Sequence, residues 1–139
     1  MRGKLRALAV CAAVVVGFTV MANEKPSPEY QTAMKNMGAA NQALRGNITN
    51  KDYAAIETNA ATFKASFTVA HAFWTAKKAD DAIKLAGDGL KGAADLEAAA
   101  KAKNDEGITA ARGTIGATCR GCHMVHREGP LADMSYEIK

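Results

Sequence analysis

Three residues with nucleophilic or metal-ligating side chains stand close together near the C-terminus, within the segment Cys119-Arg120-Gly121-Cys122-His123. Two cysteines separated by two residues and followed directly by a histidine have the spacing for covalent attachment of haem. In that chemistry the two thiols add across the vinyl groups of the porphyrin, and the histidine becomes an axial ligand of the iron. The segment therefore predicts one haem c, attached through Cys119 and Cys122, with His123 bound to the iron.

The same residues are compatible with other chemistries. A Cys-x-x-Cys pair occurs in thioredoxin-type dithiols, and in an exported protein it could oxidise to a plain disulfide. A zinc site could use Cys119, Cys122, His123 and His126, which share one helix face. However, four ligands within seven residues of one helix do not easily surround a metal tetrahedrally, and a disulfide needs no adjacent histidine. We therefore prefer the interpretation as a haem site.

The first 22 residues have the composition of a secretory signal peptide. Three basic residues open the chain, an apolar stretch extends to Met21, and the small residue Ala22 suits cleavage after it. An uncleaved anchor is the alternative, because the apolar stretch borders on the length that spans a bilayer. Attachment of haem c takes place outside the bacterial cytoplasm, so both features predict a periplasmic protein.

Size and charge limit what the exported part can be. Cleavage after Ala22 would leave residues 23–139, which is enough for one domain with a single core. The signal contains three of the 18 lysines and arginines and none of the 14 acidic residues, so 15 basic residues face 14 acidic ones and the net charge is +1. Such a balance provides no basic face for nucleic acid. The sequence also lacks an acid–base dyad, a nucleophile constellation or a phosphate loop that would indicate an enzyme.

The composition of residues 23–139 favours helix over strand, because alanine is abundant, valine is rare and the three prolines lie outside the periodic segments. Apolar residues recur three and four positions apart in four segments. The expected helices begin after Ser27, near Thr49 or Asn50, near Asp80, and after Asn104. We expect the first to end around 46–47, the stretch of 71–79 to connect the second and third, and the fourth to stop at 129–130. The pattern predicts an all-α fold, an antiparallel up-down-up-down four-helix bundle with the haem near the last helix.

With these features the chain resembles the class II c-type cytochromes, which include cytochrome c′ and its low-spin relatives of the cytochrome c-556 type. The resemblance covers residues 23–139 and rests on the haem segment in the last helix, on Arg127 four residues after His123, and on the segment Met34-Lys-Asn-Met37-Gly38 in the first helix. It implies a bundle that carries the haem, with Arg127 near it, and that often forms a homodimer. The chain departs from the family at Tyr30, where an arginine for the haem propionates is usual.

The resemblance also implies that Met34 occupies the distal position and is the second iron ligand. Methionine at helical spacing is otherwise a common filler of the core, and Met37 lies one turn away as a competing ligand. His71 and His126 are weaker candidates for metal binding. Four aromatic residues, Phe63, Phe67, Phe73 and Trp74, are expected in the core and the haem wall, in preference to a role of Trp74 as an electron relay.

The ligation of Met34 decides between two functions. If its thioether binds, the iron is six-coordinate and low-spin, and the protein is a periplasmic one-electron carrier between membrane or periplasmic redox partners. If it does not bind, the iron is five-coordinate and the protein resembles cytochrome c′, which binds nitric oxide or carbon monoxide. A third interpretation adds minor peroxidase activity to a cytochrome c.

Overall fold

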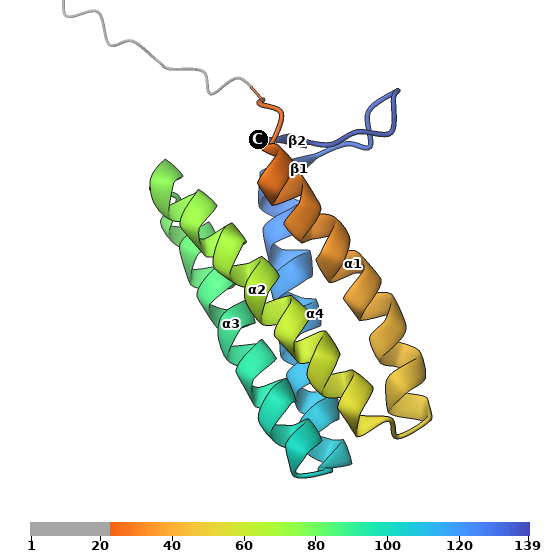
Figure 1. The fold of residues 1–139 in the computed structure, drawn as a ribbon. Coiled ribbons are helices and arrows are strands. Elements are labelled where there is room, and N and C mark those ends of the chain that lie inside the picture. The colour runs from red at the N-terminus through yellow and green to blue at the C-terminus, as the bar shows by residue number, and fades with distance from the viewer. Residues whose placement is uncertain (1–22) are drawn as a thin grey trace, which may run out of the picture.

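The computed structural model describes residues 23–139, which form four α-helices and one short β-hairpin (Figure 1). The elements are α1 (Pro28–Thr49), α2 (Tyr53–Lys77), α3 (Asp80–Lys101), α4 (Asp105–His126), β1 (Arg127–Glu128) and β2 (Glu137–Ile138). The helices lie side by side, which confirms the prediction of an all-α bundle. None of the helices within this range is long and apolar enough to cross a membrane. The predicted signal peptide, 1–22, lies outside the described residues.

Side-chain caps begin three of the four helices. The side-chain oxygens of Ser27, Asp52 and Asn104 accept hydrogen bonds from backbone N–H groups three residues further on, at 3.2, 3.0 and 3.0 Å. The predicted caps Ser27 and Asn104 are thus confirmed. The second helix begins later than predicted because α1 continues to Thr49, beyond the glycine and asparagine at which we expected it to end.

The predicted connection between the second and third helices is wrong over most of its length. Residues 71–77 belong to α2, which ends where Lys78 adopts a left-handed conformation with φ of 57°. The buried residues Phe67, Ala70 and Trp74 continue the spacing of three and four, so the helical period persists to this point. The connection is therefore only two residues long, Lys78 and Ala79.

The core consists of two clusters of buried side chains. The larger cluster contains the largest fully buried side chains, namely Phe63, Leu44, Ile56, Leu96, Ile108 and Ile115. The smaller cluster includes Tyr30, Trp74 and Ile138. Met34 is partly buried and packs against both. The two clusters follow one another along the bundle axis. The larger one extends towards the connections 50–52 and 102–104, and the smaller one lies beside the hairpin.

The hairpin lies over one end of the bundle and was not predicted from the sequence. Its strands pair antiparallel, with Arg127 opposite Ile138, and Ile138 also exchanges two backbone hydrogen bonds with Glu24, of 3.0 and 2.8 Å. The fourth helix consequently stops at His126, three residues before the predicted glycine and proline. Gly129 is required in the turn because its φ of 119° is strained for any residue with a side chain. The N-terminal and C-terminal segments are thereby tied together over the bundle end.

Candidate cofactor site

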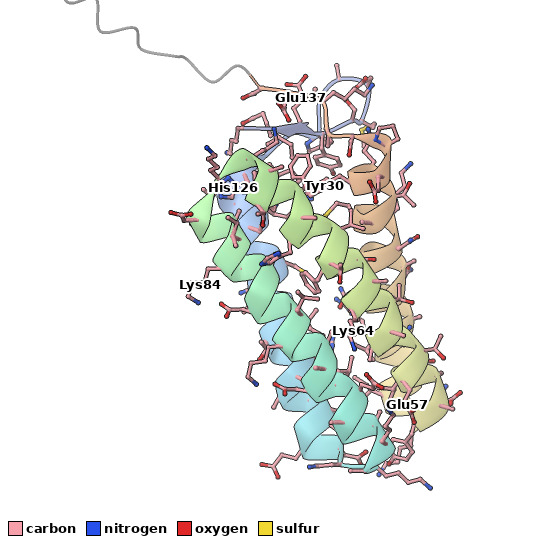
Figure 2. All side chains as sticks on the ribbon, turned by 60° about the vertical axis from the view of Figure 1, so that its left-hand side comes forward. Tyr30, Glu57, Lys64, Lys84, His126 and Glu137 are labelled. Carbon is pink, nitrogen blue, oxygen red and sulfur yellow. The ribbon has the colours of Figure 1, made fainter. Side chains whose placement is uncertain are left out.

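A cavity of about 720 Å³ lies at the end of the bundle that carries the hairpin. This volume is within the range of sites that hold small molecules and cofactors. All four helices and the hairpin contribute to its wall; the lining includes Tyr30, Met34, Met37, Phe67, Trp74, Ala86, Cys119, Cys122, His123, His126, Arg127 and Ile138. Figure 2 shows Tyr30, His126 and Glu137 at this end of the molecule and Glu57 near the other. The cavity thus brings together residues that lie almost 90 positions apart in the sequence.

The two cysteines of the haem segment line this cavity as free thiols on α4. Both are partly buried, with Cys119 against the larger core cluster and Cys122 against the smaller one. Burial raises the pKa of Cys119, and burial together with the charges of Asp81 and Cys119 raises the pKa of Cys122 to about 11. Both side chains are therefore neutral thiols at neutral pH. A thioredoxin-type dithiol needs the opposite, because its attacking cysteine is a thiolate of low pKa.

His123 is the next residue of α4 and also lines the cavity. Burial and, secondly, the nearby charge of Arg127 lower its pKa. The imidazole is therefore neutral at neutral pH, the form in which histidine binds a metal. Arg127 borders the same cavity from β1 and stacks its guanidinium on the ring of Tyr136, 4.5 Å from the centroid. Arg127 and His123 thus line the same cavity, whereas the implied closeness of Arg127 to a haem stays a prediction.

Two methionines of α1 line the cavity. Met34 is partly buried, whereas Met37 is only 6 % exposed and belongs to the larger core cluster. Both methionines therefore line the cavity, but Met37 is more deeply packed in the core. Met34 is therefore the less buried of the two methionines that line the cavity.

A line of aromatic side chains connects the cavity wall to the surface. The Trp74 indole N–H donates to the hydroxyl oxygen of Tyr30 at 3.2 Å, and the ring of His126 packs on Trp74 with centroids 4.6 Å apart. His126 also shares a hydrogen bond of 2.8 Å between its Nε2 and Oδ2 of Asp81, at the start of α3. The imidazole of His126 is thus held by the carboxylate of Asp81 and the indole of Trp74. The expectation that Trp74 lies in the core is confirmed, and its ring also lines the cavity, whereas Phe73 is only partly buried and does not line it.

The geometry offers little support for a zinc site. Within residues 23–139, no three histidine, cysteine, aspartate or glutamate side chains form a group that could hold a metal ion. His126, the fourth ligand considered above, is bonded to Asp81. His71, which we expected in a connection, lies within α2 and does not line the cavity.

Sequence reasoning missed the contribution of the hairpin to the site. Residues 133–138 line the cavity from the C-terminal side, and Met134 is 74 % exposed there. A two-residue strand pair leaves almost no periodic signal in a sequence. The glycine–proline pair that we interpreted only as a helix stop was the available sign of a turn.

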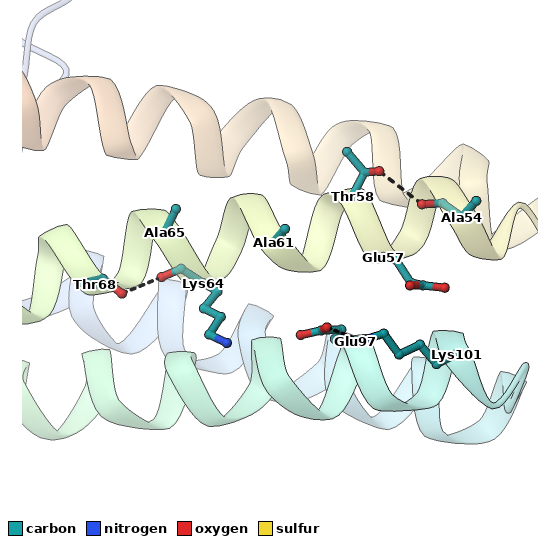
Figure 3. A pocket seen from close by; sticks show the side chains of 9 residues that line it. All are labelled: Ala54, Glu57, Thr58, Ala61, Lys64, Ala65, Thr68, Glu97 and Lys101. Atoms are coloured by element: carbon teal, nitrogen blue, oxygen red, sulfur yellow. Dashed lines mark hydrogen bonds and ion pairs between the residues drawn. The ribbon is translucent and has the colours of Figure 1, made fainter.

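A second hollow, of about 670 Å³, lies between α2 and α3 on the side of the bundle (Figure 3). Its small side chains, Ala61 and Ala65 among them, leave the floor shallow, and its threonines bond to backbone carbonyls of their own helix. Its acidic Glu97 pairs with Lys101. Its lining contains no histidine, cysteine or methionine, so we take the cavity at the bundle end as the candidate site.

Comparison of the chain with models of protein families, with curated proteins and with solved structures found no significant match.

Proposed function

We propose that this protein is a periplasmic monohaem c-type cytochrome that carries one electron between redox partners. Cys119 and Cys122 would hold the haem through thioether bonds, and His123 and Met34 would bind its iron. The proposal follows the resemblance to class II c-type cytochromes. It includes the antiparallel up-down-up-down order of the four helices, which connections of only two or three residues support.

One observation carries the proposal. The residues of the Cys-x-x-Cys-His segment, chosen from the sequence for their spacing alone, line a cavity of about 720 Å³, and Met34 lines the same cavity from another helix. A structural pair of cysteines would need no hollow beside it. A largely apolar cavity of this size at the end of a small bundle has room for a bound group.

The residues present fit haem c. The wall is largely apolar and aromatic, as a porphyrin requires, and the thiols are neutral and free to add to vinyl groups. His123 supplies a neutral imidazole and Met34 a thioether, the pair of ligands found in electron-carrying cytochromes c. When bound, the haem would supply a single reversible electron at the iron. The protein residues hold that group, restrict access of water and set its ligand field.

A cytochrome c′-like protein that binds nitric oxide or carbon monoxide is the second candidate function. The observation that favours it is the packing of Met34, which contacts both core clusters and could therefore serve only as filler. In that case the distal side of the iron would stay open. The two functions share every attachment residue and differ only in the sixth ligand.

The test begins with expression in a host that attaches haem c, followed by a haem stain of the denatured protein. We expect stain to remain with the wild-type chain and to be lost when Cys119 and Cys122 are both replaced by serine. A Cys11→Ser variant is the matched control, because Cys11 lies in the predicted signal peptide. A wild-type chain that never retains haem would refute the proposal.

Absorption spectra then separate the two candidate functions. Sharp low-spin bands of the ferrous protein that carbon monoxide leaves unchanged support the electron carrier. A broad high-spin spectrum that shifts with the gas supports the gas-binding protein. Met34→Ala should open the iron to carbon monoxide, whereas Met37→Ala should leave the low-spin spectrum in place. The opposite result would assign the ligand to Met37.

A further inference from the structure

Tyr30 occupies an unusual position for a hydroxyl group. It begins α1, is only 5 % exposed and lines the cavity from its hairpin end. Its ring is fixed by Phe73, with centroids 4.3 Å apart, and by an edge-to-face contact with Trp74 at 6.2 Å. The side chain therefore has little freedom to turn its hydroxyl towards solvent.

The hydroxyl of Tyr30 accepts one hydrogen bond but donates none within the described residues. A phenol can accept and can also donate its own proton. The oxygen accepts from the Trp74 indole at 3.2 Å, but the O–H proton meets no acceptor among residues 23–139. An unpaired donor in a buried place is costly and rare in folded proteins. The missing acceptor is therefore expected on whatever occupies the cavity.

The surroundings indicate what kind of acceptor this is. The charged side chains that line the cavity come from the N-terminal segment, α1 and the hairpin region, whereas α2 and α3 contribute none: they are Lys25, Lys35, Arg127, Asp133 and Glu137, and α4 adds the imidazoles of His123 and His126. Burial raises the pKa of Tyr30 to about 12, so the hydroxyl keeps its proton and acts as a donor at neutral pH. The three cations outnumber the two carboxylates, and together with a neutral donor they favour an anionic group with oxygen atoms.

The expected acceptor beside Tyr30 and the iron beside Met34 would lie at different positions along α1. Tyr30 precedes Met34 by four residues, or about 6 Å along the helix axis. The hydroxyl therefore lies one turn nearer to the hairpin than the thioether that we assign to the iron. A carboxylate at the edge of the bound group fits this place better than a molecule bound to the metal.

We propose that the Tyr30 hydroxyl donates a hydrogen bond to a carboxylate of the group that occupies the cavity. This inference rests on the proposed function, under which the carboxylate is a haem propionate. Trp74 is a positioning residue. Its N–H donates to one lone pair of the Tyr30 oxygen and thereby directs the hydroxyl proton of Tyr30 into the cavity.

The test compares Tyr30→Phe with Tyr53→Phe in the haem-loaded protein. Tyr53 is a matched control because its hydroxyl bonds to Asp105, away from the cavity, at 2.9 Å. The readouts are the resonance Raman bands of the propionates and the pH at which the reduction potential begins to depend on pH. Loss of a hydrogen bond to a carboxylate should make the propionate a roughly tenfold weaker acid in Tyr30→Phe and move its Raman band. Tyr53→Phe should match the wild type.

Unchanged bands and an unchanged ionisation in haem-loaded Tyr30→Phe would overturn the inference and leave the proposed function intact. A shift of the carbon monoxide or sixth-ligand spectrum alone would also overturn it, because the hydroxyl would then act at the iron. Failure of the wild-type chain to retain haem would instead refute the proposed function.

A gentler variant covers the case in which Tyr30→Phe does not fold. Placing 3-fluorotyrosine at position 30 keeps the ring and makes the hydroxyl a stronger donor. We expect the propionate to become a stronger acid, the opposite of the change in Tyr30→Phe. An unchanged propionate in this variant would overturn the inference.

Discussion

The two ends of the bundle are built from the same four helices but in opposite ways. At one end, which we call the closed end, Leu44, Ile56, Leu96 and Ile108 are at most 1 % exposed and fill the space between the helices. At the other, the open end, the cavity separates α1 from α4 and is lined by Tyr30, Met34, Trp74, Cys122 and His123. The closed end is filled by its own side chains, whereas the open end contains a cavity of about 720 Å³, which a bound group would fill under the proposed function.

Polar contacts follow the same division. At the closed end, Asp105 accepts from Lys51 at 2.7 Å and from Tyr53 at 2.9 Å, so the polar groups are satisfied within the chain. At the open end, the hydroxyl proton of Tyr30 has no acceptor among the described residues. Under the proposed function, stability would be concentrated in one half of the bundle and ligand chemistry in the other.

The largest expected effect is on the free energy of unfolding. It compares the packing of the two ends through one phenylalanine in each cluster, Phe63 and Phe73. Phe63 is 0 % exposed in the larger cluster, so Phe63→Ala should lower the free energy of unfolding by about 3–5 kcal/mol. Phe73 is only partly buried in the smaller cluster, so Phe73→Ala should cost about half as much. Urea denaturation of the cofactor-free protein measures both. Equal costs would contradict the division into a filled and an unfilled end.

Amide hydrogen exchange sharpens the comparison, because a bound group should protect only the end that it fills. We expect haem attachment to slow exchange in the first turns of α1 and the last turns of α4 by more than about tenfold. Amides around Leu44 and Leu96 should change much less. Uniform protection of both ends would show that the cofactor stabilises the whole bundle and not the open end.

A glycine pair in α3 tests how closely the helices approach beside the cavity. A Cβ at Gly89 would overlap the ring of Phe67, which also lines the cavity, so Gly89→Ala should destabilise the protein by about 1–3 kcal/mol. A Cβ at Gly87 meets nothing within 4 Å, so Gly87→Ala should stabilise the same helix by about 0.5–1 kcal/mol. Thermal unfolding measures both. A stabilising Gly89→Ala would mean that α2 and α3 separate at little cost.

The closed end was the easier part to predict from the sequence. Its residues follow the helical period without interruption, and Asn104 announces the start of α4 at that end as a cap. The failure at residues 71–77 has a physical reason. Phe73 and Trp74 are adjacent and both apolar, so the helical spacing of apolar residues is hard to recognise in the sequence. In the structure, Trp74 is buried and Phe73 is only partly buried.

The open end could be predicted only as a set of residues. The spacing of Cys119, Cys122 and His123 indicated their chemistry, but no local pattern indicates that Met34 and Trp74 would line the same cavity. Such placement depends on contacts between distant segments. The hairpin escaped prediction for the same reason, because Ile138 is held by pairing with Arg127 and Glu24 and not by a local signal.

The smallest expected effect concerns two exposed carboxylates, one at each end. A hydrogen bond from His126 lowers the pKa of Asp81, and hydrogen bonds from Lys51 and Tyr53 lower the pKa of Asp105, both from an ordinary value of 3.8. Each group is more acidic in the folded chain, so its contribution is complete above pH 3.8 and is lost as the pH falls below that value through its folded pKa. Acidification should therefore release both contacts in the same window.

Trp74 allows the two events to be separated, because it is the only tryptophan and its ring lies against His126. In the cofactor-free protein, protonation of Asp81 releases His126 and should change the fluorescence of Trp74 below pH 4 while circular dichroism keeps its helical signal. Asp81→Asn should abolish that fluorescence change, and Asp105→Asn should leave it. If fluorescence and circular dichroism instead change together in every variant, the two ends unfold as one unit, and the difference between them is one of packing alone.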